Sequence, residues 1–159
     1  NEGDYMCKEK TCCFIGHREI EEKERMSKKL TEIIENLILK ENVTKFIFGS
    51  KSRFNTLCYE MVTKLKERYP YIERVYIRAE FSEIGDKYKA YLLEKYEDTY
   101  FSQKAFGKAS YIERNKEMIE KSDFCIIYFK EDLLKPYKSG TKIAFDYAIK
   151  KNKKIVRML

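Results

Sequence analysis

The sequence lacks any long apolar stretch. No run of residues approaches the roughly 20 that a helix needs to span a bilayer. The chain also does not open with the charged, apolar and small-residue regions of a signal peptide. We therefore expect a cytoplasmic protein that binds no membrane.

The residue patterns of common metal and cofactor sites are missing as well. The chain contains no HExxH, EF-hand, Walker A or GxGxxG pattern, and none of its five cysteines belongs to a CxxC pair. The sequence thus predicts neither a metal site nor a cofactor. Buried thiols are expected instead for the cysteines that lie in apolar surroundings: Cys12, Cys13, Cys58 and Cys125.

The chain does contain enough apolar residues for a core, together with an excess of positive charge. With 159 residues, of which 43% are hydrophobic, it should form a single domain over 1–159. The first ten residues are polar and are expected to form a flexible tail. The formal net charge of +7 attracts phosphates of any kind, from nucleotides to nucleic acid. The net charge alone does not indicate which of these partners the protein binds.

Strand-like and helix-like patterns alternate along the chain. Apolar runs typical of strands recur at 11–15, 45–48, 74–79, 124–129 and 154–159. Between them, apolar residues return at helical spacing over 26–38 and 57–65. Because parallel neighbours need crossover helices, the alternation predicts a mainly parallel sheet of about five strands flanked by helices. This is a Rossmann-like three-layer α/β sandwich. The run at 74–79 is placed near an edge, and 81–109 predict a helix followed by an aromatic loop.

Ligands of such folds bind where the carboxyl ends of the strands meet the following loops and helix starts. Helix N-termini offer unpaired N–H groups and partial positive charge to an anion. We therefore expect three segments to converge on one crevice: Gly16–Arg18, 49–55 and Ser139–Thr141. Aromatic residues that could stack on a base, or fill the core, are Tyr100, Phe101 and Tyr111.

The turn before the last helical segment allows two interpretations. Gly140 lets the backbone come close to a ligand, and Ser139 and Thr141 offer hydroxyls to phosphate or ribose oxygens. The same tripeptide is also an ordinary helix cap. His17 is the only histidine and is expected at the mouth of a strand, where it is either catalytic or structural.

Several polar side chains near the expected crevice could neutralise or bind an anion. Arg18 is suited to bidentate phosphate contacts, or could form a surface ion pair with a neighbouring glutamate. Lys51 and Arg53 could neutralise a phosphate or remain solvated loop charges. Arg114 and Asn115 fall in the first turn of a helix, from which they can reach into the crevice.

Four segments taken together resemble the YpsA-type branch of the SLOG superfamily: "CCFIGHRE", "FGSKSRFNTLCYEMVTKLKERYP", "YIERNKEMIEKSDFCIIYF" and "SGTKIAFDYAIKKNKKIV". The resemblance covers most of residues 11–158. That superfamily is Rossmann-like and includes phosphoribohydrolases, DNA-processing proteins and bacterial nucleotide sensors. The resemblance implies binding of a nucleotide or nucleotide-derived ligand at Gly16, His17, Arg18, Gly49, Ser50, Lys51, Arg53, Arg114, Asn115, Ser139, Gly140 and Thr141.

The chain departs from this branch in three respects, of which the mildest is Ser139-Gly140-Thr141 where Gly-Gly-Thr is common. The usual Gly-Gly-Ala-x-Gly-x-Asp is replaced by residues 49–55, in which Ser50 and Arg53 stand for glycines and Asn55 is expected to cap the helix in place of aspartate. The enzymatic relatives carry a glutamate three residues after the Thr of the last turn. Here that position is Ala144.

We therefore expect a ligand-binding domain without the standard nucleosidase chemistry, whose catalytic residues, if any, are unknown. One alternative is an N-glycosidic-bond hydrolase or transferase in which Glu113, Asp146 or a residue of 81–109 replaces the missing glutamate. A second is a nucleic-acid-binding module, although alternating Lys and Glu are typical of ordinary solvated helices. Self-association is an expectation taken from the family.

Overall fold

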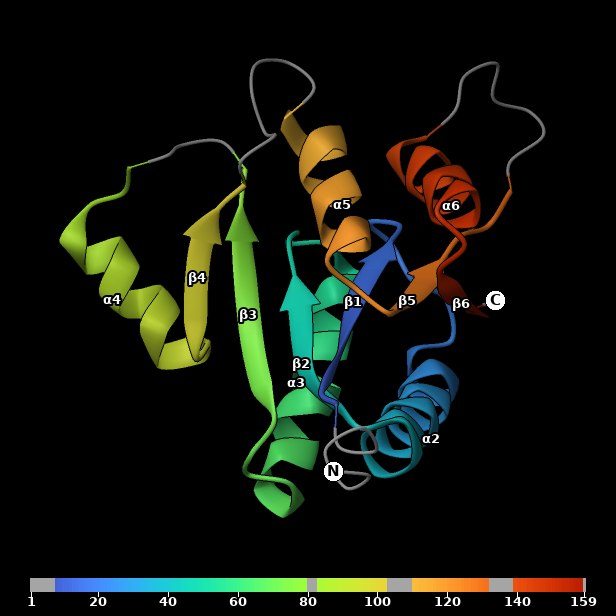
Figure 1. Ribbon diagram of the computed structural model, residues 1–159, viewed down its shortest axis with the longest axis horizontal. Helices are drawn as coiled ribbons and strands as arrows, with labels where there is room; N and C mark the ends of the chain where they lie inside the picture. The colour runs from blue at the N-terminus through green and yellow to red at the C-terminus, as the bar shows by residue number, and fades with distance from the viewer. Residues whose placement is uncertain (1–7, 80–82, 103–109, 132–138, 159) are drawn as a thin grey trace.

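The protein is built on one six-stranded parallel sheet (Figure 1). The computed structural model describes residues 8–79, 83–102, 110–131 and 139–158. The strand order is β4-β3-β2-β1-β5-β6, so the chain runs outward from β1 in one direction and then in the other. The strands are β1 (Lys10–Gly16), β2 (Val43–Phe48), β3 (Glu73–Arg78), β4 (Asp98–Phe101), β5 (Phe124–Tyr128) and β6 (Lys154–Met158).

Helices cover both faces of the sheet. In the described part of the chain they are α2 (Lys23–Glu41), α3 (Arg53–Arg68), α4 (Asp86–Lys95), α5 (Ser110–Glu120) and α6 (Gly140–Lys150). The pair α2 and α3 packs on one face, the pair α5 and α6 on the other, and α4 lies beside the edge strand β4. The expected Rossmann-like three-layer architecture is confirmed.

The continuous apolar character of β1 and β5 follows from this arrangement. Cys12 and Phe14 point into the core beneath α2 and α3, whereas Cys13 and Ile15 point into the core beneath α5 and α6. Because both faces are buried, apolar residues occupy successive positions rather than every second one. The thiols expected to be buried are buried, at Cys12, Cys13, Cys58 and Cys125.

Two expectations need correction. The sheet has six strands rather than about five, because β4 lies within the stretch expected to be an aromatic loop. The strand β3 lies near the edge of the sheet, as expected, with only β4 outside it. Lys10, expected in the polar tail, is instead the first residue of β1, and its backbone N–H donates to the carbonyl of Asn42. Residues 1–7 lie outside the described residues.

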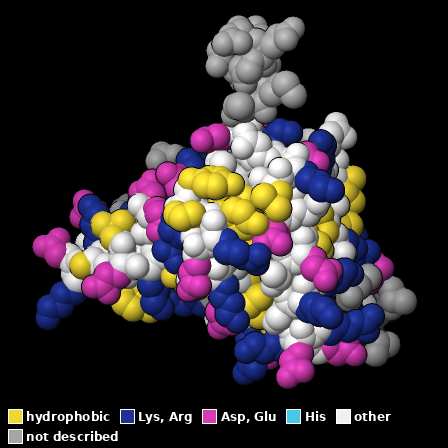
Figure 2. All heavy atoms as spheres, turned by 90° about the horizontal axis from the view of Figure 1, so that it is seen from below, with side chains coloured by type: hydrophobic (Ala, Val, Ile, Leu, Met, Phe, Trp, Pro, Cys, Tyr) yellow, Lys and Arg dark blue, Asp and Glu magenta, His cyan; other side chains and the backbone are white. Residues whose placement is uncertain are grey.

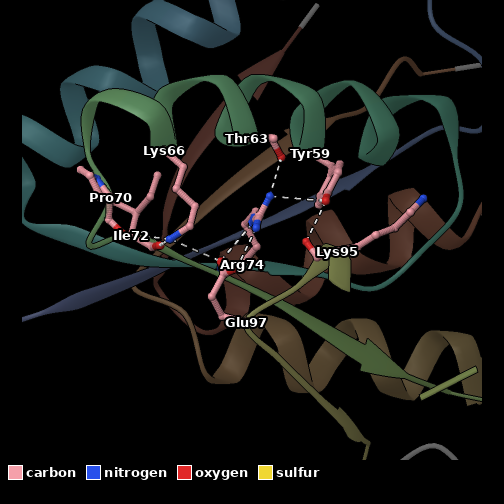
Figure 3. Close-up of polar contacts among 8 residues, drawn as sticks. All are labelled: Tyr59, Thr63, Lys66, Pro70, Ile72, Arg74, Lys95 and Glu97. Carbon is pink, nitrogen blue, oxygen red and sulfur yellow. Dashed lines mark hydrogen bonds and ion pairs between the residues drawn. The ribbon is translucent and has the colours of Figure 1, made fainter. Parts of the chain in front are cut away.

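A charged cluster fastens the short strand β4 to the rest of the sheet (Figure 3). Glu97, directly before β4, accepts hydrogen bonds from the backbone and guanidinium of Arg74 on β3, at 2.7 to 3.0 Å. The same guanidinium donates to the hydroxyl of Thr63 on α3. Partial burial alone would raise the pKa of Glu97, but the hydrogen bonds and charge of Arg74, with Lys66, hold that pKa below its usual value.

Candidate functional site

The carboxyl ends of the strands surround a crevice with a volume of about 2010 Å³. Three strands, β1, β3 and β5, the loop after β2, and the N-terminal turns of α3, α5 and α6 contribute residues to its walls. This is the end of the sheet toward which the strand arrows point in Figure 1. All twelve residues proposed from the sequence line it: Gly16, His17, Arg18, Gly49, Ser50, Lys51, Arg53, Arg114, Asn115, Ser139, Gly140 and Thr141.

Two of the three glycines at the crevice are required by packing. A Cβ atom at Gly16 would lie 2.6 Å from the ring of Phe54, and one at Gly49 would lie 2.5 Å from the sulfur of Met118. Both distances are far below ordinary contact, so a side chain there would displace the core. Gly140 has no heavy atom within 4 Å of the corresponding position. Only at Gly140 does a missing side chain leave open space in front of the backbone.

Backbone N–H groups at the start of α3 are already hydrogen-bonded to other residues of the protein. The N-cap is Ser52, whose hydroxyl accepts from the backbone N–H of Asn55 at 3.1 Å. The expectation that Asn55 caps this helix is therefore wrong, because the chain enters the helix three residues earlier. The N–H of Arg53 donates to the carbonyl of Arg18 at 2.9 Å. With these N–H groups used, the loop offers an anion fewer backbone donors than a glycine-rich turn would.

The start of α6 is more open. The hydroxyl of Ser139 caps the helix by accepting from the N–H of Lys142 at 3.1 Å. The cap interpretation of Ser139 is thus confirmed, and it leaves Gly140 and Thr141 at the crevice. Thr141 is buried, whereas Gly140 is exposed. This helix end combines partial positive charge with unobstructed backbone, which suits an anionic group.

His17 links the ends of β1 and β5, the neighbouring strands from which the two halves of the sheet extend. Its Nε2 accepts a hydrogen bond from the backbone N–H of Lys130, just after β5, at 2.8 Å. The same Nε2 lies 3.2 Å from the carbonyl oxygen of Lys130. The geometry supports the structural interpretation of His17, because Nε2 is engaged by the protein.

Positive charge predominates in the crevice. Among the described residues, its lining contains the cations Arg18, Lys51, Arg53, Arg78, Arg114, Lys130 and Lys142 but only the carboxylates Glu19, Glu21 and Glu131. Two of these carboxylates neutralise cations, in the pairs Arg53–Glu19 at 3.1 Å and Lys130–Glu21 at 3.4 Å. The surface ion pair suggested for Arg18 therefore forms at Arg53 instead. Within the described residues, neither Arg18 nor Lys51 forms an ion pair, so their charge is available to a bound anion.

The guanidinium of Arg114 is held inside the wall of the crevice. The side chain is only 5% exposed, and it lies against Gly49, where a Cβ atom would be 2.9 Å from Nε. Its guanidinium stands 5.3 Å from the ring centre of Tyr111 and donates weakly to Asn115 at 3.4 Å. An arginine fixed in this way is arranged in advance for contact with a planar or tetrahedral anion.

The structure adds lining residues that were not proposed from the sequence. On the side of β3 and α4 these include Tyr76, Arg78, Ala79 and Tyr88. Arg78 and Ala79 stand at the carboxyl end of β3, so the rule that pointed to the other loops could have found them. Of the candidate stacking residues, Tyr111 lines the crevice, whereas Tyr100 and Phe101 do not.

The carboxylates proposed from the sequence for N-glycosidic chemistry do not line the crevice. Ala144 is 1% exposed and packs in the apolar core under α6. Neither Glu113 nor Asp146 lines the crevice, and they pair with Lys116 and Lys142 respectively. Of the stretch 81–109, residues 83–102 are described, and the rest lies outside the described residues.

Among the described residues, no three His, Cys, Asp or Glu side chains gather where they could hold a metal ion. The helices of the described ranges do not combine the length and apolar character needed to cross a bilayer. Compared with known proteins, the chain matches no family model, and no curated protein is significantly similar to it.

Proposed function

We propose that this protein binds a nucleotide or a nucleotide-derived ligand in the crevice. The observation that carries the proposal is the convergence of the three loops on one cationic crevice beside the open N-terminal turn of α6. Gly140 and Thr141 would receive a phosphate, with Arg18, Lys51 and Arg114 supplying charge. Tyr111, 48% exposed on the crevice wall, offers an aromatic face to a base. The resemblance to the YpsA-type branch of the SLOG superfamily supports the same site.

The direct test is thermal unfolding of the protein with and without a panel of nucleoside mono-, di- and triphosphates. A bound nucleotide stabilises the folded state by mass action and raises Tm. The Gly140→Leu variant should lose this rise, because its side chain fills the space in front of the helix start, while its own Tm stays close to that of the wild type. If no nucleotide raises Tm of the wild type, the proposal is wrong.

A matched pair of arginine variants separates site charge from general charge. Arg18 is an exposed residue at the crevice, and Arg25 is an exposed residue on α2. Arg18→Gln should weaken nucleotide binding about 10- to 150-fold, the range for loss of one charge-assisted contact of about 1.5–3 kcal/mol. Arg25→Gln should leave binding unchanged. Equal effects of the two variants would show that only net charge matters.

The two alternatives are less well supported. For an N-glycosidic enzyme, the carboxylate best placed is Glu131, which lines the crevice and has no ion pair within the described ranges. Release of free base from a nucleotide would support that activity. For a nucleic-acid module, the basic residues should gather on one face. Figure 2 shows acidic and basic side chains interspersed at the amino ends of the strands, so the charge excess is not concentrated on that face.

A further inference from the structure

A buried amide without a complete set of partners lies at the crevice. Asn55, in the first turn of α3, is 3% exposed and contributes to the crevice lining. Its side-chain oxygen Oδ1 has no hydrogen-bond partner among the described residues. Buried polar atoms of native proteins are nearly always hydrogen-bonded, so an exception requires a specific explanation.

The neighbouring loop does not supply the missing donor. The hydroxyl of Ser52 lies 3.3 Å from the amide nitrogen of Asn55, and it also accepts from the Asn55 backbone N–H. The hydroxyl of Ser50 donates to that same Ser52 oxygen at 3.1 Å. If the amide were turned over so that its oxygen faced Ser52, its nitrogen would instead lack a partner. In either orientation, one polar atom of the Asn55 side chain is unpaired.

The cationic side chains of the loop do not donate to Oδ1 of Asn55 either. Lys51 and Arg53 are exposed, and Arg53 is engaged by Glu19 at 3.1 Å. An apolar residue of the same size would give up only the 3.3 Å contact of the amide nitrogen with the Ser52 hydroxyl and would bury no unpaired polar atom. The amide is therefore unfavourable for the free protein and is best explained by a contact made with something else.

We propose that the Asn55 side chain recognises the ligand through its unpaired amide atom: in the orientation of the structure, Oδ1 accepts a hydrogen bond from a hydroxyl or amino group of the ligand. This inference rests on the proposed function, and it narrows the ligand class. A fully ionised oxyanion presents only acceptors and would oppose the oxygen of Asn55. The site therefore selects a phosphorylated nucleoside, whose phosphate meets the cations while a ribose hydroxyl or a base amine donates to Asn55.

The test compares Asn55→Leu with Asn36→Leu, the same replacement at an exposed position of α2. Adenosine 5′-monophosphate is the probe, and binding is measured by isothermal titration calorimetry. Asn55→Leu should weaken binding at least about 10-fold, equivalent to about 1.4 kcal/mol, and Asn36→Leu should leave it unchanged. Without ligand, Asn55→Leu should unfold at a Tm no lower than that of Asn36→Leu.

Ligand analogues identify which donor is recognised. The 2′-deoxy analogue lacks one ribose hydroxyl, and purine riboside 5′-monophosphate lacks the base amine. The analogue that has lost the recognised donor should bind the wild type more weakly than adenosine monophosphate does, and Asn55→Leu should no longer distinguish the two. Inorganic phosphate should bind the wild type and Asn55→Leu equally.

The possible outcomes separate the two proposals. If nucleotides bind the wild type and Asn55→Leu equally well, the assignment of Asn55 is wrong although the proposed function stands. A free-protein Tm of Asn55→Leu well below that of Asn36→Leu would also overturn it, because the amide would then hold the protein's own structure. If no nucleotide binds the wild type, the proposed function fails and this inference fails with it.

Discussion

Replacing Gly16 by alanine tests the packing at the centre of the crevice. Gly16 ends β1, and a Cβ atom there would lie 2.6 and 2.9 Å from Cγ and Cβ of Phe54. The ring of Phe54 is fully buried and stacks on Tyr128 at a centroid distance of 5.5 Å. It cannot turn aside as the end of a flexible side chain would, so the added methyl group must displace α3 or β1.

Overpacking of this kind typically costs about 1–3 kcal/mol of the free energy of unfolding. In a protein of this size, each kcal/mol lowers Tm by about 2–4 °C. We therefore expect Gly16→Ala to lower Tm by about 2–12 °C. Urea unfolding followed by circular dichroism should show a lower midpoint with an unchanged slope, as expected for lost stability without a change in exposed surface.

The control is Gly140→Ala, where no heavy atom lies within 4 Å of the new methyl group. Because alanine is a better helix former than glycine, this variant should be as stable as the wild type or more stable, by at most about 1 kcal/mol. In a double-mutant cycle, Phe54→Leu should cost less in the Gly16→Ala background than in the wild type, since it removes the clash. The reasoning is refuted if Gly16→Ala and Gly140→Ala are equally stable.

Two further predictions concern the pH dependence of stability and the buried thiols. The pKa of Glu97 is lower in the folded than in the unfolded protein. The contribution of Glu97 to the free energy of unfolding is therefore present above the unfolded pKa of about 4.3 and is lost as pH falls through the lower folded pKa. Urea unfolding between pH 7 and about pH 3 should therefore show Glu97→Gln losing less stability with acid than the wild type; parallel curves would contradict this. Burial raises the pKa of Cys12 and Cys58, and the thiolate is the form of cysteine that reacts with iodoacetamide. Peptide mass mapping should therefore show both thiols unlabelled in the native protein and labelled in the urea-unfolded protein. Rapid native labelling would show that the core opens.

The strand β4 shows why the sequence was less informative at the sheet edge than at its centre. The central strands are buried on both faces, so their apolar runs are continuous and easily read. The residues of β4 are exposed or only partly buried, and its sequence "DTYF" carries no such run. The contact between Arg74 and Glu97 that fastens this strand joins residues 23 positions apart. No local pattern encodes that pairing.

The start of α3 shows the same limit within the site. Two serines and an asparagine stand within "GSKSRFN", and each is a competent cap. The choice of Ser52 depends on where the chain leaves β2 and on the bond from Arg53 to the carbonyl of Arg18. That carbonyl belongs to a loop distant in the sequence, so the cap and the burial of Asn55 could not be read from the heptapeptide.

The sequence by itself determined the α/β layering and the meeting of three loops at one end of the sheet. The spacing of apolar residues is a local property of the sequence, and it predicts the strands and helices. Because the strands are parallel, every strand-to-helix loop then lies at the same end of the sheet. Only the tertiary structure decided what each residue does there: that Gly16 and Gly49 make room for side chains, that His17 joins β1 to the end of β5, and that Asn55 keeps an unpaired amide at the crevice. These roles depend on distances between atoms of different elements, and such distances exist only once the layers have packed.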